Sequence, residues 1–443
     1  MLHCMNAPPT PLVAATPAVP TGPLTTAATA AHAPVIAPTA WATLAVLALV
    51  YLLNFLDRTL IYILFPPIKA ELSFSDLQLA LLGSTSFVLF YTSLGIPFGR
   101  LADRVSRRKL IAIGLATWSI FSGMTGFAHD FWTIFGCRVM VGVGEATLGP
   151  AAMSWLSDLF PRERRGTVQS AYSAGIPLGA AAAFFLGGHL GATWGWRAAF
   201  WALGFPGLAL AGVVLLLPEA RRAAAVVAPT SWREDLRALW QSRVLRWHIA
   251  GYALLAVASN SLSIWIPSFL KGARGMALAD IGNLTGLSMA ISGGLATATG
   301  GYLADRIAAG RPAGRLRFGA MLALACTPVW LLLLWGTQPW MYQAAFFLLA
   351  GLGLAWLGPA AADVHDLVGP SRRGVGVAAY ILVVNLVGYG IAPPLVGALS
   401  DTLGVATDPL VQRIALVSAP VACLAAATCL WRGVVLTRRG VEG

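Results

Sequence analysis

The chain has 443 residues, of which 57% are hydrophobic and only 11% are charged. A soluble domain carries about 25% charged residues, so this composition excludes an ordinary water-soluble enzyme. The 30 Lys and Arg exceed the 18 Asp and Glu, which gives a formal net charge of +12. On a soluble chain this excess would suggest a nucleic-acid partner. The five cysteines form no CxxC pair, so we expect neither a zinc site nor a disulfide framework.

The first 40 residues differ in composition from the rest of the chain. They are rich in Ala, Pro and Thr and contain no Lys or Arg. A secretory signal peptide needs a positively charged start, so the composition predicts a disordered tail instead. A start codon assigned too far upstream would explain this segment equally well.

Twelve apolar segments follow, each long enough to cross a membrane. About 20 apolar residues span the hydrocarbon core as a helix. A spanning backbone must also satisfy its own hydrogen bonds, so the sequence predicts an all-helical membrane protein. The predicted spans are 41–65, 77–100, 109–129, 131–160, 167–191, 196–218, 246–270, 280–304, 316–336, 339–362, 374–400 and 410–436.

The loops between these spans differ in charge. Most Lys and Arg fall in every second loop, which places those loops and both termini in the cytoplasm. The basic residues left in the outer loops are Lys69, Arg197, Lys271, Arg274 and Arg413. Membrane topology therefore explains the basic composition without nucleic acid as a partner. The excess of Arg over Lys, 27 against 3, is typical of a GC-rich bacterium and predicts its inner membrane.

Two loop motifs occur twice in the chain. GRLADR at 99–104 recurs 202 residues later as GYLADR, and DLFPRERRG at 158–166 recurs 208 residues later as DLVGPSRRG. This recurrence predicts two six-helix halves, and internal repeats with a binding site between them are the architecture of secondary transporters. The predicted parts are a tail at 1–40, a first bundle at 41–218, a cytoplasmic linker at 219–245, a second bundle at 246–437 and a tail at 438–443.

The loop sequence GRLADRVSRR, with its partner in the second half, resembles the major facilitator superfamily over nearly all of residues 41–436. NFLDR at 54–58 and RVMVGVGEA at 138–146, followed by DLFPRERRG, look like the bacterial Spinster-like lipid transporters. The resemblance implies two pseudo-symmetric six-helix bundles, alternating access and a monomer. Organic anion:proton symporters of the same superfamily carry a similar Asp-Arg on the first helix and a similar Arg and Glu on the fourth.

Four ionisable residues fall well inside the predicted spans: Asp57, Arg58, Arg138 and Glu145. Each costs roughly 2.5 to 3.5 kcal/mol at the centre of a membrane helix, so mutual pairing is favoured. Arg138 and Glu145 are seven residues apart and share one helix face. Counting 1.5 Å per residue from the span ends places Arg138 near Asp57, with Glu145 deeper.

We interpret these four residues as the coupling site. Asp57 and Glu145 would bind and release protons, while Arg58 and Arg138 would tune the pKa values of both carboxylates and attract an anionic head group. The alternative is a static ion-pair network that only fixes how the two helices pack.

The second half is expected to contribute an uncharged, partly polar wall to the predicted cavity. The span that repeats the first has Ser259, Asn260, Ser261 and Ser263 but no charge at that depth. The head group of an amphiphile would therefore lie among the first-half charges, with its tail along aromatic side chains of the second half, although these could equally serve ordinary helix packing. The cavity candidates are Asn260, Trp265, Phe269, Trp356, Tyr380, Asn385 and Tyr389.

The repeated loop motifs have another expected role. Asp103 can complement the positive N-terminal dipole of the helix that follows it. The superfamily resemblance implies a conformational latch between the halves, whereas topology signalling by positive charge is the simpler explanation. The latch candidates are Gly99, Asp103, Arg104, Asp158, Arg164, Arg165, Asp305 and Arg306.

Other kinds of membrane protein lack support in the sequence. No lysine follows a glycine as in GxxxxGK[ST], which excludes an ATP-driven pump. The six histidines form no HxxxH or HExxH pattern, which disfavours a metalloenzyme. GVGEAT at 142–147 lacks the third glycine of a dinucleotide fingerprint, so it indicates close helix packing.

We therefore expect a transporter and not an enzyme, with the proton as coupling ion and no cofactor. The Spinster resemblance implies an anionic amphiphilic lipid as substrate, such as a lysophospholipid or a sphingosine-phosphate-like molecule. Proton symport of a small organic anion such as a sugar acid is the alternative. A non-transporting receptor or membrane enzyme is a third, less favoured hypothesis.

Overall fold

The computed structural model describes residues 37–102, 104–161, 164–219, 237, 239–309, 311, 313–368, 373–404 and 409–440. Every regular element in these ranges is a helix, which confirms the all-helical prediction. The chain from residue 36 onward forms one unit. Residues 1–36 of the predicted tail, most of the predicted linker at 219–245 and the latch candidate Asp103 lie outside the described residues. The tail predicted to extend to residue 40 ends earlier, because α1 already begins at Pro38.

The first part of the chain folds into helices that alternate with short breaks. They are α1 (Pro38–Ile63), α2 (Phe65–Leu72), α3 (Asp76–Ala80), the π-helix η1 (Leu81–Thr85), α4 (Ser86–Ala102), α5 (Arg107–Met124), the 3-10 helix η2 (Thr125–Phe127), α6 (Phe131–Glu145), α7 (Leu148–Leu159), α8 (Arg165–Ser173), α9 (Gly175–Thr193), α10 (Gly195–Gly204) and α11 (Gly207–Leu216).

The second part repeats this alternation. Its helices are α13 (Arg243–Arg274), α14 (Leu278–Ser288), the π-helix η4 (Met289–Gly293), α15 (Gly294–Ala308), α16 (Gly314–Trp335), α17 (Pro339–Leu352), α18 (Leu357–Val368), α19 (Arg373–Asn385), the π-helix η6 (Leu386–Ile391), α20 (Ala392–Thr402), α21 (Pro409–Leu416) and α22 (Ser418–Arg438).

Among the described residues, ten helical segments are long and apolar enough to cross a membrane. Two further predicted spans, 131–160 and 280–304, are also helical, but neither is both long and apolar enough to be counted as a membrane-crossing helix. The first is interrupted after Glu145, which leaves α6 and α7 with 15 and 12 residues. The second is continuous but contains Asp280 and many small residues. The ten are Pro38–Leu72, Asp76–Gly95, Arg107–Phe127, Arg165–Thr193, Gly195–Leu216, Arg243–Arg274, Gly314–Trp335, Pro339–Val368, Val375–Thr402 and Pro409–Arg438.

Polar side chains in the loops fix where several helices begin. Ser75 and Gln78 form a capping box at the start of α3, and the Ser106 hydroxyl accepts from the first turn of α5. Asp130 caps α6, and its carboxylate accepts hydrogen bonds from the Thr133 hydroxyl at 2.5 Å and the Thr133 amide at 3.0 Å. These bonds lower the pKa of Asp130, because they favour its charged form.

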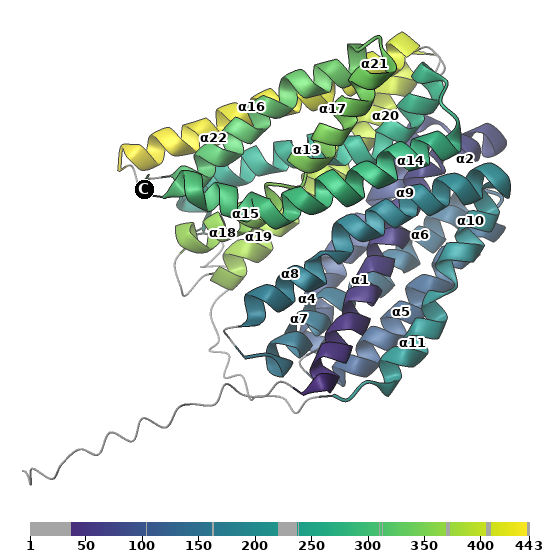
Figure 1. The fold of residues 1–443 in the computed structure, drawn as a ribbon, viewed down its shortest axis with the longest axis horizontal. Coiled ribbons are helices and arrows are strands. Elements are labelled where there is room, and N and C mark those ends of the chain that lie inside the picture. Colours follow the sequence, from purple (N-terminus) through teal and green to yellow (C-terminus); the bar gives the residue numbers. More distant parts are fainter. Residues whose placement is uncertain are drawn as a thin grey trace, which may run out of the picture. The chain divides into compact units, whose positions relative to one another are not determined.

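Helices α1 to α11 pack mainly with one another, as do α13 to α22 (Figure 1). The two sets meet where α9 crosses α14, where α1 lies along α13 and where α3 contacts α20. The α9–α14 crossing depends on glycine, because a Cβ on Gly188 would lie 2.8 Å from the Cα of Gly282. Small residues are what allow membrane helices to approach this closely.

The buried apolar side chains form two clusters. The larger joins residues near the end of α1, such as Tyr62 and Phe65, to the second set of helices, including Trp265. The buried members of the smaller cluster, such as Leu47 and Trp118, all come from the first set and lie toward the start of α1. The two sets therefore share their core at the end of the molecule where α1 ends.

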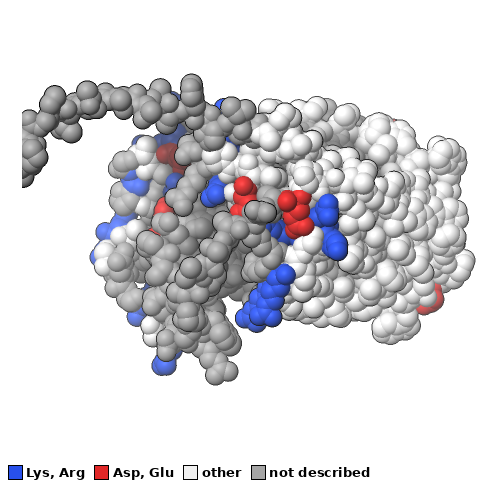
Figure 2. Space-filling model, turned by 90° about the horizontal axis from the view of Figure 1, so that it is seen from below, with Lys and Arg blue, Asp and Glu red and all other residues white. Residues whose placement is uncertain are grey.

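The surface is that of a membrane protein. In Figure 2 the charged side chains of the face shown gather toward one end and a broad remainder of that face is white. Large apolar side chains are exposed on both sets of helices, among them Trp132, Trp194, Tyr302, Trp340 and Leu395. An apolar surface of this kind is suited to lipid contact.

Candidate functional site

The four charges predicted inside the membrane lie together and are almost fully buried. Asp57 and Arg58 come from α1, and Arg138 and Glu145 from α6; their exposed fractions range from 0% to 9%. The Arg58 guanidinium donates to one oxygen of Glu145, from Nη2 at 2.9 Å and from Nε at 3.3 Å. One buried ion pair therefore joins α1 to α6.

Asp57 and Arg138 have other partners. The Ser122 hydroxyl on α5 donates to the Asp57 carboxylate at 2.6 Å. Arg138 donates to the main-chain carbonyls of Asp57 at 3.2 Å and Arg58 at 3.3 Å. The depth predicted for Arg138 is thus observed, but its hydrogen bonds go to the backbone beside Asp57. Residue counting fixes depth along a helix and not its rotation, so it did not identify Arg58 as the partner of Glu145.

Aromatic side chains surround the Arg58 guanidinium. Its central carbon lies 4.7 Å from the ring centroid of Phe55, 4.4 Å from that of Phe87 and 4.8 Å from that of Tyr91. Such cation–π contacts contribute about 2 kcal/mol or more each when desolvated. Sequence reasoning missed Phe87 and Tyr91, although their spacing of four residues places both on one face of α4.

Several buried polar atoms around the ion pair have no hydrogen-bond partner among the described residues. They include the second carboxylate oxygen of Glu145, Nε of Arg138 and the side-chain nitrogen of Asn54. Asn54 was also missed by the sequence analysis, yet it lies one turn before Arg58 on α1 and so faces the same way. Unsatisfied buried groups are costly, which leaves this site poised to accept a further polar partner.

A small cavity of about 70 Å³ lies between the two sets of helices; its lining includes Phe55, which contacts Arg58, but none of the four charged residues. Phe55, Thr59 and Tyr62 of α1 line it on one side, and Asn260 of α13 and Tyr389 of η6 line it on the other. Its volume corresponds to roughly two water molecules. Two of the predicted cavity candidates, Asn260 and Tyr389, are thus brought to the wall opposite α1.

The other predicted cavity candidates lie elsewhere. Tyr380 and Trp356 belong to an aromatic cluster within the second set, where Tyr380 lies 5.6 Å from His248, and Trp356 stacks on Tyr252 with ring centroids also 5.6 Å apart. Asn385 is half-buried at the end of α19. Trp265 and Phe269 line a separate cavity near the end of α13.

The repeated loop motifs form equivalent ion pairs in the two halves. Arg107 of α5 pairs with Asp158 at 2.6 Å, and Arg315 of α16 pairs with Asp366 and, at 2.8 Å, with Asp305. Each pair lies within one half. Arg165 donates to main-chain carbonyls of its own loop. Gly99 lies near Pro150, while Arg104 and Arg306 are exposed and Arg164 lies just before α8.

The glycines of GVGEAT serve helix packing, as predicted. A Cβ on Gly142 would lie 2.7 Å from the main-chain oxygen of Phe87, and one on Gly144 would lie 2.7 Å from that of Gly114. In the described part of the chain, no group of three or more His, Cys, Asp or Glu could hold a metal ion.

Comparison with known proteins identifies the class. Residues 47–393 match the family model of the Major Facilitator Superfamily, and the chain belongs to that family. An MFS-type efflux pump of Mycolicibacterium smegmatis is 33% identical over 413 residues, which cover 91% of this chain and 94% of the pump. The family and the fold are those of membrane transporters, not enzymes.

Within the superfamily the chain is similar to the Spinster proteins. Protein spinster of Drosophila melanogaster is 26% identical over 380 residues, 82% of this chain and 62% of the fly protein. The inward-facing, unoccupied structure of a bacterial homologue of the human lysosomal transporter Spinster matches with a TM-score of 0.81 at 24% identity, covering 91% of this chain and 98% of that one. The protein is thus a multi-pass integral membrane transporter of the Major Facilitator Superfamily, and it is similar to Spinster proteins in sequence and fold.

Proposed function

We propose that this protein is a proton-coupled secondary active transporter of an anionic, single-chain lipid, such as a lysophospholipid or a sphingosine-phosphate-like molecule. The observation that carries the proposal is the buried Arg58–Glu145 ion pair beside a cavity between the two halves. A membrane helix retains buried charges chiefly where they function, because each one is costly.

The coupling follows from an exchange of partners. An anionic head group would draw the Arg58 guanidinium away from Glu145. Leaving one member of a buried ion pair without its partner costs about 3–5 kcal/mol, so Glu145 would take up a proton at that step. Substrate and proton would then be bound together, which is the requirement for symport.

Asp57 offers a second proton site. Its partner is the Ser122 hydroxyl, which can donate to a carboxylate and also accept from a carboxylic acid. Asp57 can therefore gain a proton and keep its hydrogen bond. Arg138, held by main-chain carbonyls of α1, would keep this segment positively charged for the head group.

The apolar character of the cavity supports a lipid over a sugar acid. Phe55, Tyr62, Ile176, Pro177 and Leu354 supply much of its lining. An alkyl chain would bury apolar area against these side chains, while the polar side chains of the same lining, such as Thr59, Ser259 and Asn260, would serve the head group.

The remaining architecture belongs to the same proposal. We place twelve membrane helices in two six-helix bundles, at 41–218 and 246–437, by adding α6 with α7 and α14 with α15 to the ten apolar segments. Both termini would lie in the cytoplasm of a bacterial inner membrane, and the transporter would act as a monomer by alternating access. The ion pairs of Asp158, Asp305 and Asp366 would then form a cytoplasmic latch that changes partners during the cycle.

The test is proton flux in liposomes that contain a pH-sensitive dye. A lysophospholipid, a sphingosine-type phosphate and a panel of sugar acids are presented separately to the wild type and to Glu145→Gln. Glu71→Gln is the matched control, because Glu71 forms a half-exposed ion pair with Arg197 outside the site. We expect lipid-dependent proton flux in the wild type and the control and its loss in Glu145→Gln. Flux with a sugar acid alone would identify an organic anion symporter instead, and lipid transport without proton flux would exclude coupling.

A further inference from the structure

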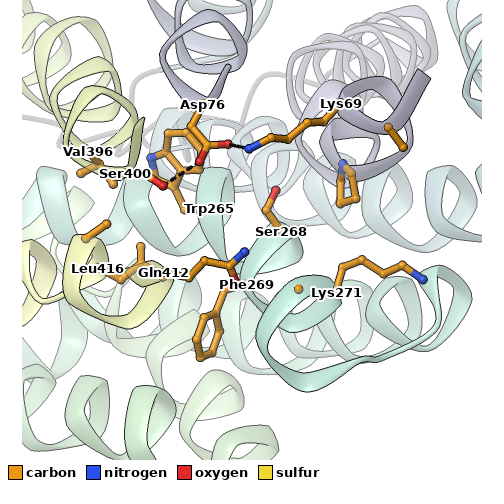
Figure 3. A pocket seen from close by; sticks show the side chains of 14 residues that line it. Lys69, Asp76, Trp265, Ser268, Phe269, Lys271, Val396, Ser400, Gln412 and Leu416 are labelled. Atoms are coloured by element: carbon orange, nitrogen blue, oxygen red, sulfur yellow. Dashed lines mark hydrogen bonds and ion pairs between the residues drawn. The ribbon is translucent and has the colours of Figure 1, made fainter. Parts of the chain in front are cut away.

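A larger cavity lies apart from the charged site, toward the end of the molecule where α1 ends (Figure 3). Its volume is about 460 Å³, within the range of about 300–1,000 Å³ that small-molecule sites occupy. Its walls come from both halves, with α2 and α3 on one side and α13, α20 and α21 on the other. A ligand there would touch both halves at once.

Hydrogen-bond donors converge on this cavity. Lys69 comes from α2, and Trp265 and Ser268 come from α13, with Ser268 between Lys69 and Phe269 in the view of Figure 3. Trp265 is only 6% exposed, and its indole nitrogen has no hydrogen-bond partner among the described residues. The side chain of Lys271 is exposed at the rim, where its four-carbon stem can turn toward the opening. A site with several donors, two of them cationic, suits an anionic oxygen ligand.

Apart from Asp76, Ser400 and Gln412, the rest of the lining is apolar. Phe269 forms the floor, and Val396, Ala415 and Leu416 complete the wall on the side of α20 and α21. Burial of a chain against these side chains would contribute about 0.8 kcal/mol for each methylene group. The cavity therefore has a cationic part and an apolar part, the two properties of an amphiphile.

The one carboxylate in the cavity is already engaged. Asp76 forms an ion pair with Lys69 and accepts a hydrogen bond from Ser400 of the opposite half at 2.7 Å (Figure 3). An anionic head group would compete with Asp76 for Lys69. The same exchange would weaken the polar contact that holds the two halves together at this end.

We propose that this cavity is a second substrate site, which binds the phosphate or carboxylate head group of a single-chain amphiphile through Lys69, Lys271 and Trp265. The head group displaces Asp76 from Lys69 and so favours opening at this end of the molecule. The inference rests on the proposed function for the identity of the ligand, but the site itself is tested by binding and not by transport.

Equilibrium binding of radiolabelled lysophosphatidate to the full chain in nanodiscs of zwitterionic lipid tests the site. The Arg58→Gln background removes the central site, so that the remaining binding reports on the cavity. We expect affinity to fall about tenfold or more when Lys69→Gln and Lys271→Gln are combined. Lys109→Gln is the matched control, because Lys109 lies at the start of α5, at the opposite end of the molecule. Equal affinity in the double variant and the control would overturn the proposal.

A variant that should raise the affinity for lysophosphatidate distinguishes competition between Asp76 and the ligand for Lys69 from a structural role of Asp76. Asp76→Asn keeps the shape of the side chain but releases Lys69, so we expect lysophosphatidate affinity to rise about fivefold, the scale of a partly exposed ion pair. A merely structural role for Asp76 would lower affinity or leave it unchanged, and that result would refute the exchange. If Arg58→Gln does not fold, the wild type must show a two-site isotherm that becomes one-site in the double lysine variant; a one-site isotherm in both would overturn the second site.

Competitors distinguish the sources of the head group. Inorganic phosphate tests a free anion, and phosphatidylglycerol added to the nanodisc tests a two-chain membrane lipid. We expect neither to displace lysophosphatidate at equal concentration. Displacement by phosphate alone would show an anion site with no role for the chain, and displacement by phosphatidylglycerol would show a membrane-lipid site; either result overturns the single-chain assignment. Loss of proton coupling in the liposome assay with cavity binding intact would refute the central mechanism and leave this site standing.

Discussion

At the scale of single residues, the four buried charges divide into two kinds of contact. Glu145 is held by a cation, Arg58, whereas Asp57 is held by a neutral hydroxyl and Arg138 by main-chain carbonyls. Only the first contact is between opposite full charges, so it is the one that an anionic ligand can replace. The other two tie α5 and α6 to the same turn of α1 and keep that turn in register.

The hydroxyl of Ser122 should therefore matter for stability. Ser122→Ala leaves the buried Asp57 carboxylate without this donor, and an unsatisfied buried group costs about 1–3 kcal/mol. We expect thermal unfolding of the purified protein to occur at a lower temperature in Ser122→Ala. Ser119→Ala is the control, because the Ser119 hydroxyl lies on the same helix, is buried and has no hydrogen-bond partner among the described residues. Equal shifts in both variants would contradict a specific role for the Asp57 contact.

At the scale of helices, the two halves meet most closely where α9 crosses α14. A Cβ on Gly188, Gly282 or Gly286 would come within 3.0 Å of backbone atoms of the facing helix. The crossing is thus a backbone-to-backbone contact, which leaves little room for the helices to separate or slide sideways. In the proposed alternating access, the halves would rotate about this contact.

Adding a methyl group at this crossing tests its importance. In Gly188→Ala the new Cβ would lie 2.8 Å from the Cα of Gly282, so the helices must move apart, and overpacking of this kind costs about 1–3 kcal/mol. We expect a lower unfolding temperature together with reduced transport. Gly136→Ala on α6 is the control, because no atom lies within 4 Å of its Cβ position. Wild-type behaviour of Gly188→Ala would show that the crossing is looser than its geometry indicates.

At the scale of the whole molecule, the sequence predicted what depends on length and spacing. Apolar length located the helices, as when the span predicted at 41–65 became α1 at Pro38–Ile63. The repeated motifs marked equivalent loops, where the structure shows matching ion pairs of Asp158 and Asp366 that the motifs alone did not predict. Rotation of a helix about its axis is set by its neighbours, so the partner of Glu145 and the position of Trp356 within the second half were not predictable. The span predicted at 131–160 is helical, but the pattern of apolar residues did not predict the break after Glu145 that separates α6 from α7.

At the end of the molecule where α1 ends, hydrogen bonds between Asp401 and the start of α3 join the two halves and keep this end closed; we call them the clasp. The Asp401 carboxylate of α20 accepts hydrogen bonds from the main-chain amides of Asp76 and Leu77, each at 2.9 Å, at the start of α3. The carboxylate also faces the positive end of the continuous helix Asp76–Gly95. These bonds exist only while this end is closed, so removing them should shift the population toward the form that is open there.

Asp401→Ala should therefore expose side chains that the closed form buries. We expect labelling of Val396→Cys, a residue only 5% exposed beside the clasp, by a hydrophilic maleimide in nanodiscs to quicken about tenfold, in a background without the native cysteines. Asp280→Ala is the control, because Asp280 is an exposed carboxylate in the first turn of α14, at the same end. An unchanged labelling rate in Asp401→Ala would show that the apolar core shared by Phe65 and Trp265, and not the clasp, keeps this end closed. Acceleration in both variants would point to general loosening by lost charge, whereas acceleration in Asp401→Ala alone would assign the closed state to two main-chain hydrogen bonds across the halves.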